Sequence, residues 1–182
     1  MYIFLYLVNY IIGDAMYYIN SFLLYSVLGF IMESCLYKIM SIDNYSGFMY
    51  GPVTPVYGVG VIFILLIHKY IIEKMRTYNI IKIIITFIVC CICLTIIEFL
   101  GGFLLEKIFD IELWNYSDKK YNFGRYICLE ISIAWGLVSV FFIYIVKPFM
   151  DKFIKRIPRK ATYLFICLFF IDLCLVIIKH FS

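Results

Sequence analysis

The chain has 182 residues, of which 65% are hydrophobic, and its mean hydropathy is +0.98. In a soluble globular domain about half of the residues are apolar. The composition of this chain therefore excludes a soluble domain and indicates an integral membrane protein that contacts membrane lipids. The net charge of +4 is small, and we expect no nucleic-acid partner.

Apolar segments of spanning length predict an all-α fold, a polytopic membrane helix bundle that forms one integral membrane domain over residues 1–182. A spanning helix needs about 20 residues, and the chain holds five segments close to that length. Residues 1–12 are apolar but too short to span, so they either extend the first helix or lie along the membrane surface. The predicted spans are 16–37, 56–72, 83–105, 126–146 and 162–178.

The entry to the second span has an unusual sequence, GFMYGPVTPVYGVG, over residues 47–60. Its prolines cannot lie inside a regular helix, and its glycines permit close backbone approach. Non-helical backbone at membrane depth is tolerated only where protein buries it or where it lines a wet cavity. We therefore predict a broken or re-entrant entry, with motif residues Gly51, Pro52, Pro55, Tyr57 and Gly58.

Basic residues predict the orientation. The loops after the second and fourth spans hold ten of the sixteen Lys and Arg residues, and the remaining six lie elsewhere. Cytoplasmic loops carry the excess of Lys and Arg, so we predict a cytoplasmic N-terminus and an external C-terminus. Both motif-bearing loops would then face away from the cytoplasm.

The longest polar interruption, residues 113–136, reads LWNYSDKKYNFGRYICLEISIAWG and leads into the fourth span. It is richer in aromatic, amide and charged residues than a simple connection requires. We interpret its Trp and Tyr side chains, Trp135 included, as interfacial anchors rather than ligand stackers. Its motif residues are Trp114, Tyr116, Ser117, Asn122 and Gly124.

Acidic residues within the spans predict a polar site. At about 1.5 Å per residue, Glu33 and Glu98 lie about 24 Å from the inner ends of their spans, in the same outer layer as Glu130. Such groups usually face a partner or a cavity, and they often mark functional sites. The predicted polar cluster or substrate site comprises Glu33, Glu98, Glu106, Arg125 and Glu130.

This cluster has two interpretations. It is either a structural staple between helix ends or a functional site. Asp172, near the centre of the fifth span, has no nearby basic residue in that span. It is either neutral or paired with another chain, helix-helix hydrogen bonding is favoured over a proton relay, and we predict that it is a candidate contact in an oligomer. The cysteines, including the run from Cys90 to Cys93, are interpreted as packing residues without a His partner, and we expect no metal and no cofactor.

Several motifs support a family resemblance. A shared G-F-x-x-E pattern, at Gly29–Glu33 and Gly102–Glu106, suggests an internal repeat. Together with the two motif loops, these features resemble the bacterial membrane family named putative ABC-transporter type IV, also called CmpB-like, over residues 26–148. Two departures concern Asn115, where the family commonly has Asp, and the early position of the Gly124–Arg125 pair. The resemblance implies a permease subunit.

The leading functional prediction is a transport-related membrane protein that resembles such a permease subunit, with a polar site in the outer leaflet. The chain lacks G-x-x-x-x-G-K-[ST], H-E-x-x-H and G-x-S-x-G motifs. We therefore expect a non-enzymatic chain that works as a homo-oligomer or beside a separate ATPase subunit. The alternatives are a membrane-embedded enzyme that acts on a lipid or wall precursor through Glu98 or Glu130, and a non-catalytic scaffold or sensor.

Overall fold

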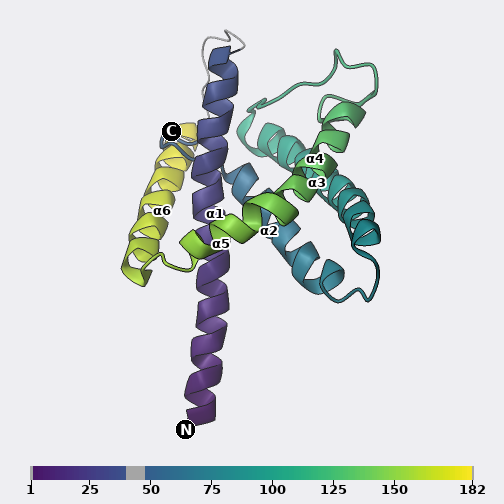
Figure 1. The fold of residues 1–182 in the computed structure, drawn as a ribbon. Helices are drawn as coiled ribbons and strands as arrows, with labels where there is room; N and C mark the ends of the chain where they lie inside the picture. The colour runs from purple at the N-terminus through teal and green to yellow at the C-terminus, as the bar shows by residue number, and fades with distance from the viewer. Residues whose placement is uncertain (1, 40–47, 182) are drawn as a thin grey trace. The chain divides into compact units, whose positions relative to one another are not determined.

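A computed structural model describes residues 2–39 and 48–181 of the chain (Figure 1). Gly47, the first residue of the 47–60 motif, lies outside the described residues. The described helices are α1 (Tyr2–Ile39), α2 (Pro55–Ile67), η1 (His68–Ile72, a π-helical turn), α3 (Asn79–Phe109), α4 (Leu129–Phe141), η2 (Phe142–Val146, also π-helical), α5 (Lys147–Ile154) and α6 (Arg159–Phe181). Two short strands, β1 (Asn122–Phe123) and β2 (Ile127–Cys128), pair antiparallel.

Within the described ranges, five helices are long and apolar enough to cross a membrane: Gly13–Ile39, Pro55–Ile72, Asn79–Phe109, Leu129–Ile154 and Arg159–His180. The predicted all-α membrane class with five spans is confirmed. Residues 48–54 are non-helical, so the second span does begin with a break. The first helix begins at Tyr2, which agrees with the interpretation that residues 1–12 extend the first helix.

The helix that holds the fourth predicted span begins and ends later in the chain than the predicted bounds of 126–146. Residues 127–128 belong to the β hairpin, and the helix starts only at Leu129. At its other end the helix continues through η2 and α5 to Ile154, so Lys147 and Lys152 are helical rather than part of a loop. Hydropathy marks the apolar stretch, whereas backbone hydrogen bonding sets the ends of the helix, and the two differ by several residues here.

The helices group into two compact units. The first combines the described residues of 1–59 with those of 150–182, and the second covers residues 60–149. In the first unit α1 and α6 lie side by side (Figure 1). The Thr162 hydroxyl donates to the Asn20 side chain at 2.7 Å, and both residues are buried. The rings of Phe22 and Phe169 pack edge to face.

In the second unit α3 and α4 pack along a seam of small and polar residues. Four buried α3 residues recur at every fourth position and so share one face of the helix. On α4, a Cβ at Gly136 would lie 3.0 Å from the Phe87 carbonyl oxygen and closer still to its ring, so glycine permits the close approach. The α3 stripe consists of Thr86, Cys90, Leu94 and Glu98.

Candidate functional site

Glu98 occupies the end of the buried α3 stripe. Glu98 is buried, with only 5% of its surface exposed. The Tyr116 hydroxyl donates to Oε1 at 2.9 Å, and the Trp135 indole nitrogen donates to Oε2 at 3.0 Å. Among the residues that the structure describes, no Lys or Arg forms an ion pair with Glu98. A buried carboxylate therefore rests on two neutral donors.

These two donors come from different segments. Trp135 lies on α4, which the helix seam holds against α3, whereas Tyr116 lies in the loop between α3 and the β hairpin. Tyr116 and Trp135, which we predicted to be interfacial anchors rather than ligand stackers, have a further role that was not predicted from the sequence, because both ring donors are directed to Glu98. The general tendency of a buried Tyr hydroxyl or Trp indole to find a hydrogen-bond partner is the signal that could have suggested this role.

The loop that carries Tyr116 is fixed by its own side chains. The side-chain oxygen Oδ1 of Asn115 accepts hydrogen bonds from the Ser117 backbone amide at 2.9 Å and from the Ser117 hydroxyl at 2.6 Å. The Asn122 side-chain amide donates to the carbonyl oxygens of Tyr116, Ser117 and Lys119. These bonds replace the regular backbone pairing that a loop lacks. The predicted motif residues Tyr116, Ser117 and Asn122 are thus brought together.

The end of the loop is a hairpin turn that orients Arg125. Gly124 has a φ of +63°, a left-handed conformation that favours glycine. The Tyr116 amide then donates to the Arg125 carbonyl oxygen at 2.9 Å. This bond joins the start of the loop to its end, so Tyr116 and Arg125 are positioned by the same turn.

Arg125 forms a second polar group, separate from Glu98 in its contacts. Its guanidinium lies 2.8 Å from Glu112 and 3.5 Å from Glu106. The side-chain amide nitrogen of Asn115 donates to the other Glu112 oxygen at 2.7 Å. An Asp at position 115 would lack this donor and would repel Glu112. Glu112 was missed in the sequence because it lies in a loop, outside every span.

Aromatic residues cover this second group. Gly102 leaves room for the rings of Trp114 and Tyr126, which a Cβ would approach to 3.2 Å. The Trp114 indole donates to the Tyr126 carbonyl oxygen at 3.0 Å. Desolvation and a hydrogen bond to Glu106 raise the pKa of the Tyr126 phenol, so it stays protonated and acts as a donor.

The other predicted cluster residues lie elsewhere. Glu130 is exposed in the first turn of α4, and its carboxylate contacts the Cys128 thiol. Glu33 is half-buried on α1 in the first unit. The structure therefore brings Glu98 into one hydrogen-bonded group and Glu106 with Arg125 into another. Membership of all five residues in one site stays a prediction.

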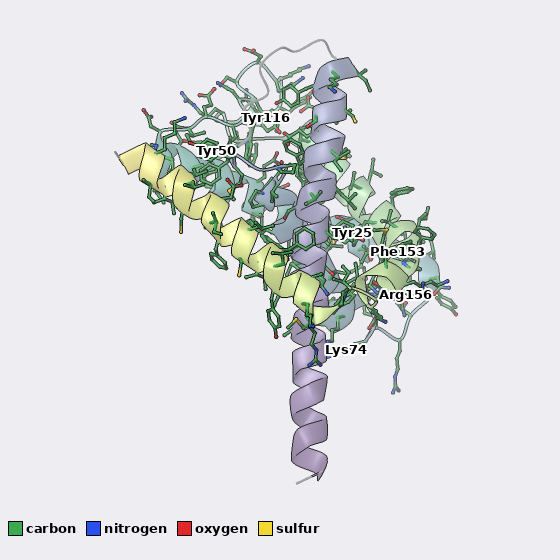
Figure 2. All side chains as sticks on the ribbon, turned by 90° about the vertical axis from the view of Figure 1, so that its left-hand side faces the viewer. Tyr25, Tyr50, Lys74, Tyr116, Phe153 and Arg156 are labelled. Atoms are coloured by element: carbon green, nitrogen blue, oxygen red, sulfur yellow. The ribbon has the colours of Figure 1, made fainter. Side chains whose placement is uncertain are left out.

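The broken entry to α2 forms a junction of its own in the first unit. Asp172, on α6, accepts the backbone amides of Tyr50 at 3.0 Å and Gly51 at 2.9 Å. A Cβ at Gly51 would lie 3.0 Å from the Asp172 carboxylate. Figure 2 shows Tyr50 beside α6, where Lys179 lies 5.4 Å from its ring centroid. Asp172 is therefore not unpaired, since its carboxylate accepts two backbone amides within the chain, and its contact with another chain stays a prediction.

The same junction is closed from α1. The Thr54 amide donates to the Ser26 carbonyl oxygen at 3.0 Å. A Cβ at Gly58 would overlap the Ser26 hydroxyl, and a Cβ at Gly29 would overlap the Tyr57 ring. Pro52 lies in the non-helical stretch, and Pro55 is the first residue of α2, where a missing N–H costs nothing. The predicted motif residues of this segment therefore have packing roles.

No group of three or more His, Cys, Asp or Glu residues is placed to hold a metal ion in the described part of the chain. The family model described as "Putative ABC-transporter type IV" matches residues 3–179. The chain belongs to this family. Together with the five membrane-compatible helices, this match identifies a transport-related membrane protein. No curated protein and no solved structure matches the chain.

The two polar groups should differ in their effect on stability. Tyr116→Phe leaves one oxygen of a buried carboxylate without its donor and should cost about 1–3 kcal/mol. Arg125→Gln removes partly exposed ion pairs and should cost about 1 kcal/mol or less. Thermal unfolding of both variants in mild detergent measures the difference. A larger loss for Arg125→Gln than for Tyr116→Phe would contradict this ranking.

The Asp172 carboxylate should slow hydrogen–deuterium exchange of the backbone amides in residues 48–54, the entry to α2. Asp172→Leu removes the acceptor for the Tyr50 and Gly51 amides, so a peptide that covers residues 48–54 should exchange hydrogen for deuterium faster. Asp118→Leu, at an exposed position of the other unit, serves as the control and should leave this peptide unchanged. Unaltered exchange in Asp172→Leu would show that the two hydrogen bonds do not hold the segment.

Proposed function

We propose that the chain is a permease-type subunit of a transport system and that Glu98 is the centre of its polar site. The observation that carries this proposal is a carboxylate in a long apolar helix, 5% exposed, that accepts hydrogen bonds from two neutral donors, Tyr116 and Trp135. An acid near the centre of a span costs about 2.5–3.5 kcal/mol on insertion scales, and such residues commonly mark ion or substrate pathways.

The energy source would lie in another subunit. The sequence holds no P-loop motif, so ATP hydrolysis of that type would come from a separate ATPase chain. The family match supports such a partner, because its description names an ABC transporter. The chain would supply the membrane path, and the partner would bind and hydrolyse the nucleotide. A homo-oligomer is compatible with this arrangement.

Glu98→Gln separates a transport site from a structural staple. The substitution preserves the shape of the side chain and removes the negative charge. The Gln oxygen can still accept from the Trp135 indole, and the Gln NH2 can donate to the Tyr116 hydroxyl oxygen. Membrane vesicles from the natural host, with the gene deleted and then restored, would be energised with ATP, and their solutes compared by mass spectrometry. We expect wild type to restore an ATP-dependent change in at least one solute and Glu98→Gln to match the deletion.

Two controls make this comparison interpretable. Asp118→Asn removes a charge from an exposed loop position and should transport like wild type. Glu98→Gln should insert and elute from a sizing column as wild type does, with a small change in thermal midpoint. A folded Glu98→Gln variant with full transport would leave the structural staple as the role of this residue. Vesicles that wild type does not alter would contradict the transport proposal itself.

We also propose a cytoplasmic N-terminus and an external C-terminus, from the excess of basic residues in two loops. Lys119→Cys and Arg159→Cys each replace an exposed basic residue, one in the loop after α3 and one at the start of α6. On intact cells, a membrane-impermeant thiol reagent should label Lys119→Cys alone, above the background of the native cysteines. Labelling of Arg159→Cys alone would reverse the orientation.

A further inference from the structure

The turn between α5 and α6 is short and well fixed. Residues 155–158 connect two helices that are apolar enough to cross a membrane, so the turn lies at the membrane surface. Backbone bonds run from the Lys155 amide to the Asp151 carbonyl oxygen and from the Arg156 amide to that of Phe153. On its inner side Ile154 is 1% exposed and Thr162 is 1% exposed. The backbone is therefore held from both ends.

Five cations project from this fixed turn. They lie within nine residues, all are exposed, and none forms an ion pair with an acidic side chain that the structure describes. Asp151, the only acid between Ile131 and Ile171, accepts the Tyr17 hydroxyl at 2.7 Å instead. The basic turn, as we name this surface, consists of Lys152, Lys155, Arg156, Arg159 and Lys160.

Exposed aromatic side chains flank the cations. Phe153 is 58% exposed on α5, and Tyr163 is 54% exposed on α6. Figure 2 shows Phe153 and Arg156 at the end of α5 that leads into α6. A site for a soluble anion would need the cations but not the aromatic rings. A phospholipid has both a phosphate group and hydrocarbon chains, so it can contact the cations and the rings together. Aromatic rings beside Lys and Arg are typical of the membrane interface.

We propose that the basic turn is a binding site for anionic phospholipids, with headgroup phosphates against the cations and acyl chains against Phe153 and Tyr163. Charge complementarity selects an anionic headgroup over a zwitterionic one. The fixed backbone adds to the attraction, because the cations are already grouped before the lipid arrives. This site is independent of the proposed transport site at Glu98.

The experiment uses the full chain, purified and delipidated in mild detergent. Phosphatidylglycerol, phosphatidylcholine and inorganic phosphate are added separately, and bound lipid is counted by native mass spectrometry. A parallel thermal unfolding series measures the stabilisation that each compound gives. We expect phosphatidylglycerol to bind and stabilise the chain, and phosphatidylcholine and inorganic phosphate to do so far less. Equal effects of all three would overturn the proposal.

Two matched triple variants locate the site. Lys155→Gln/Arg156→Gln/Arg159→Gln should weaken phosphatidylglycerol binding roughly tenfold or more, since each cation near an anionic surface contributes to the attraction. Lys107→Gln/Lys119→Gln/Lys120→Gln removes as many exposed charges from the other unit and should bind as wild type does. Equal losses in the two variants would show that general charge, not the basic turn, attracts the lipid.

A measurement on wild type keeps the proposal testable if the first triple variant aggregates. Stabilisation by phosphatidylglycerol should fall as the salt concentration rises from about 0.05 to 0.5 M, because exposed charges are screened over that range. Stabilisation that does not change with salt would contradict a headgroup site made of exposed cations.

Discussion

Carboxylates inside apolar helices need hydrogen-bond donors that their own helix cannot supply, and this requirement determines where the irregular segments lie. Glu98 obtains its donors from a loop and from a neighbouring helix, through Tyr116 and Trp135. Asp172 obtains them from the backbone of residues 50–51. Each acid thereby holds a non-helical segment against a helix. These hydrogen bonds offset part of the free-energy cost of placing the acid in the membrane, and they also fix the position of the non-helical segment.

Glycine makes these contacts sterically possible. The Asp172 carboxylate can reach the Gly51 amide because no Cβ stands between them, and Gly58 lets the start of α2 lie on the Ser26 hydroxyl. In the other unit, Gly102 leaves room for Trp114 and Tyr126 above the end of α3. The glycine-rich motifs are therefore explained by close packing around polar contacts, and a ligand is not needed to account for them.

Hydropathy was sufficient to predict the class of fold and the number of spans, since long apolar segments have few other structures available. The partners of the acids were harder to predict. Tyr116 and Trp135 are 18 and 37 residues from Glu98, and their role depends on how the loop and α4 fold. The partners of Asp172 are backbone amides, which every residue but proline carries, so the sequence holds no sign of them.

The structure also shows that the basic residues differ in their partners. The sequence gives ten Lys and Arg in two loops against six elsewhere. One of the six, Arg125, is paired with Glu106 and Glu112, so it contributes little net positive charge. The five cations of the basic turn have no such partners among the described residues, and the nearby Asp151 faces Tyr17. Since acidic residues contribute little to the rule that sets orientation, the proposed cytoplasmic position of the basic turn still rests on the count of Lys and Arg, and the exposed cations of this turn are available to an anionic leaflet.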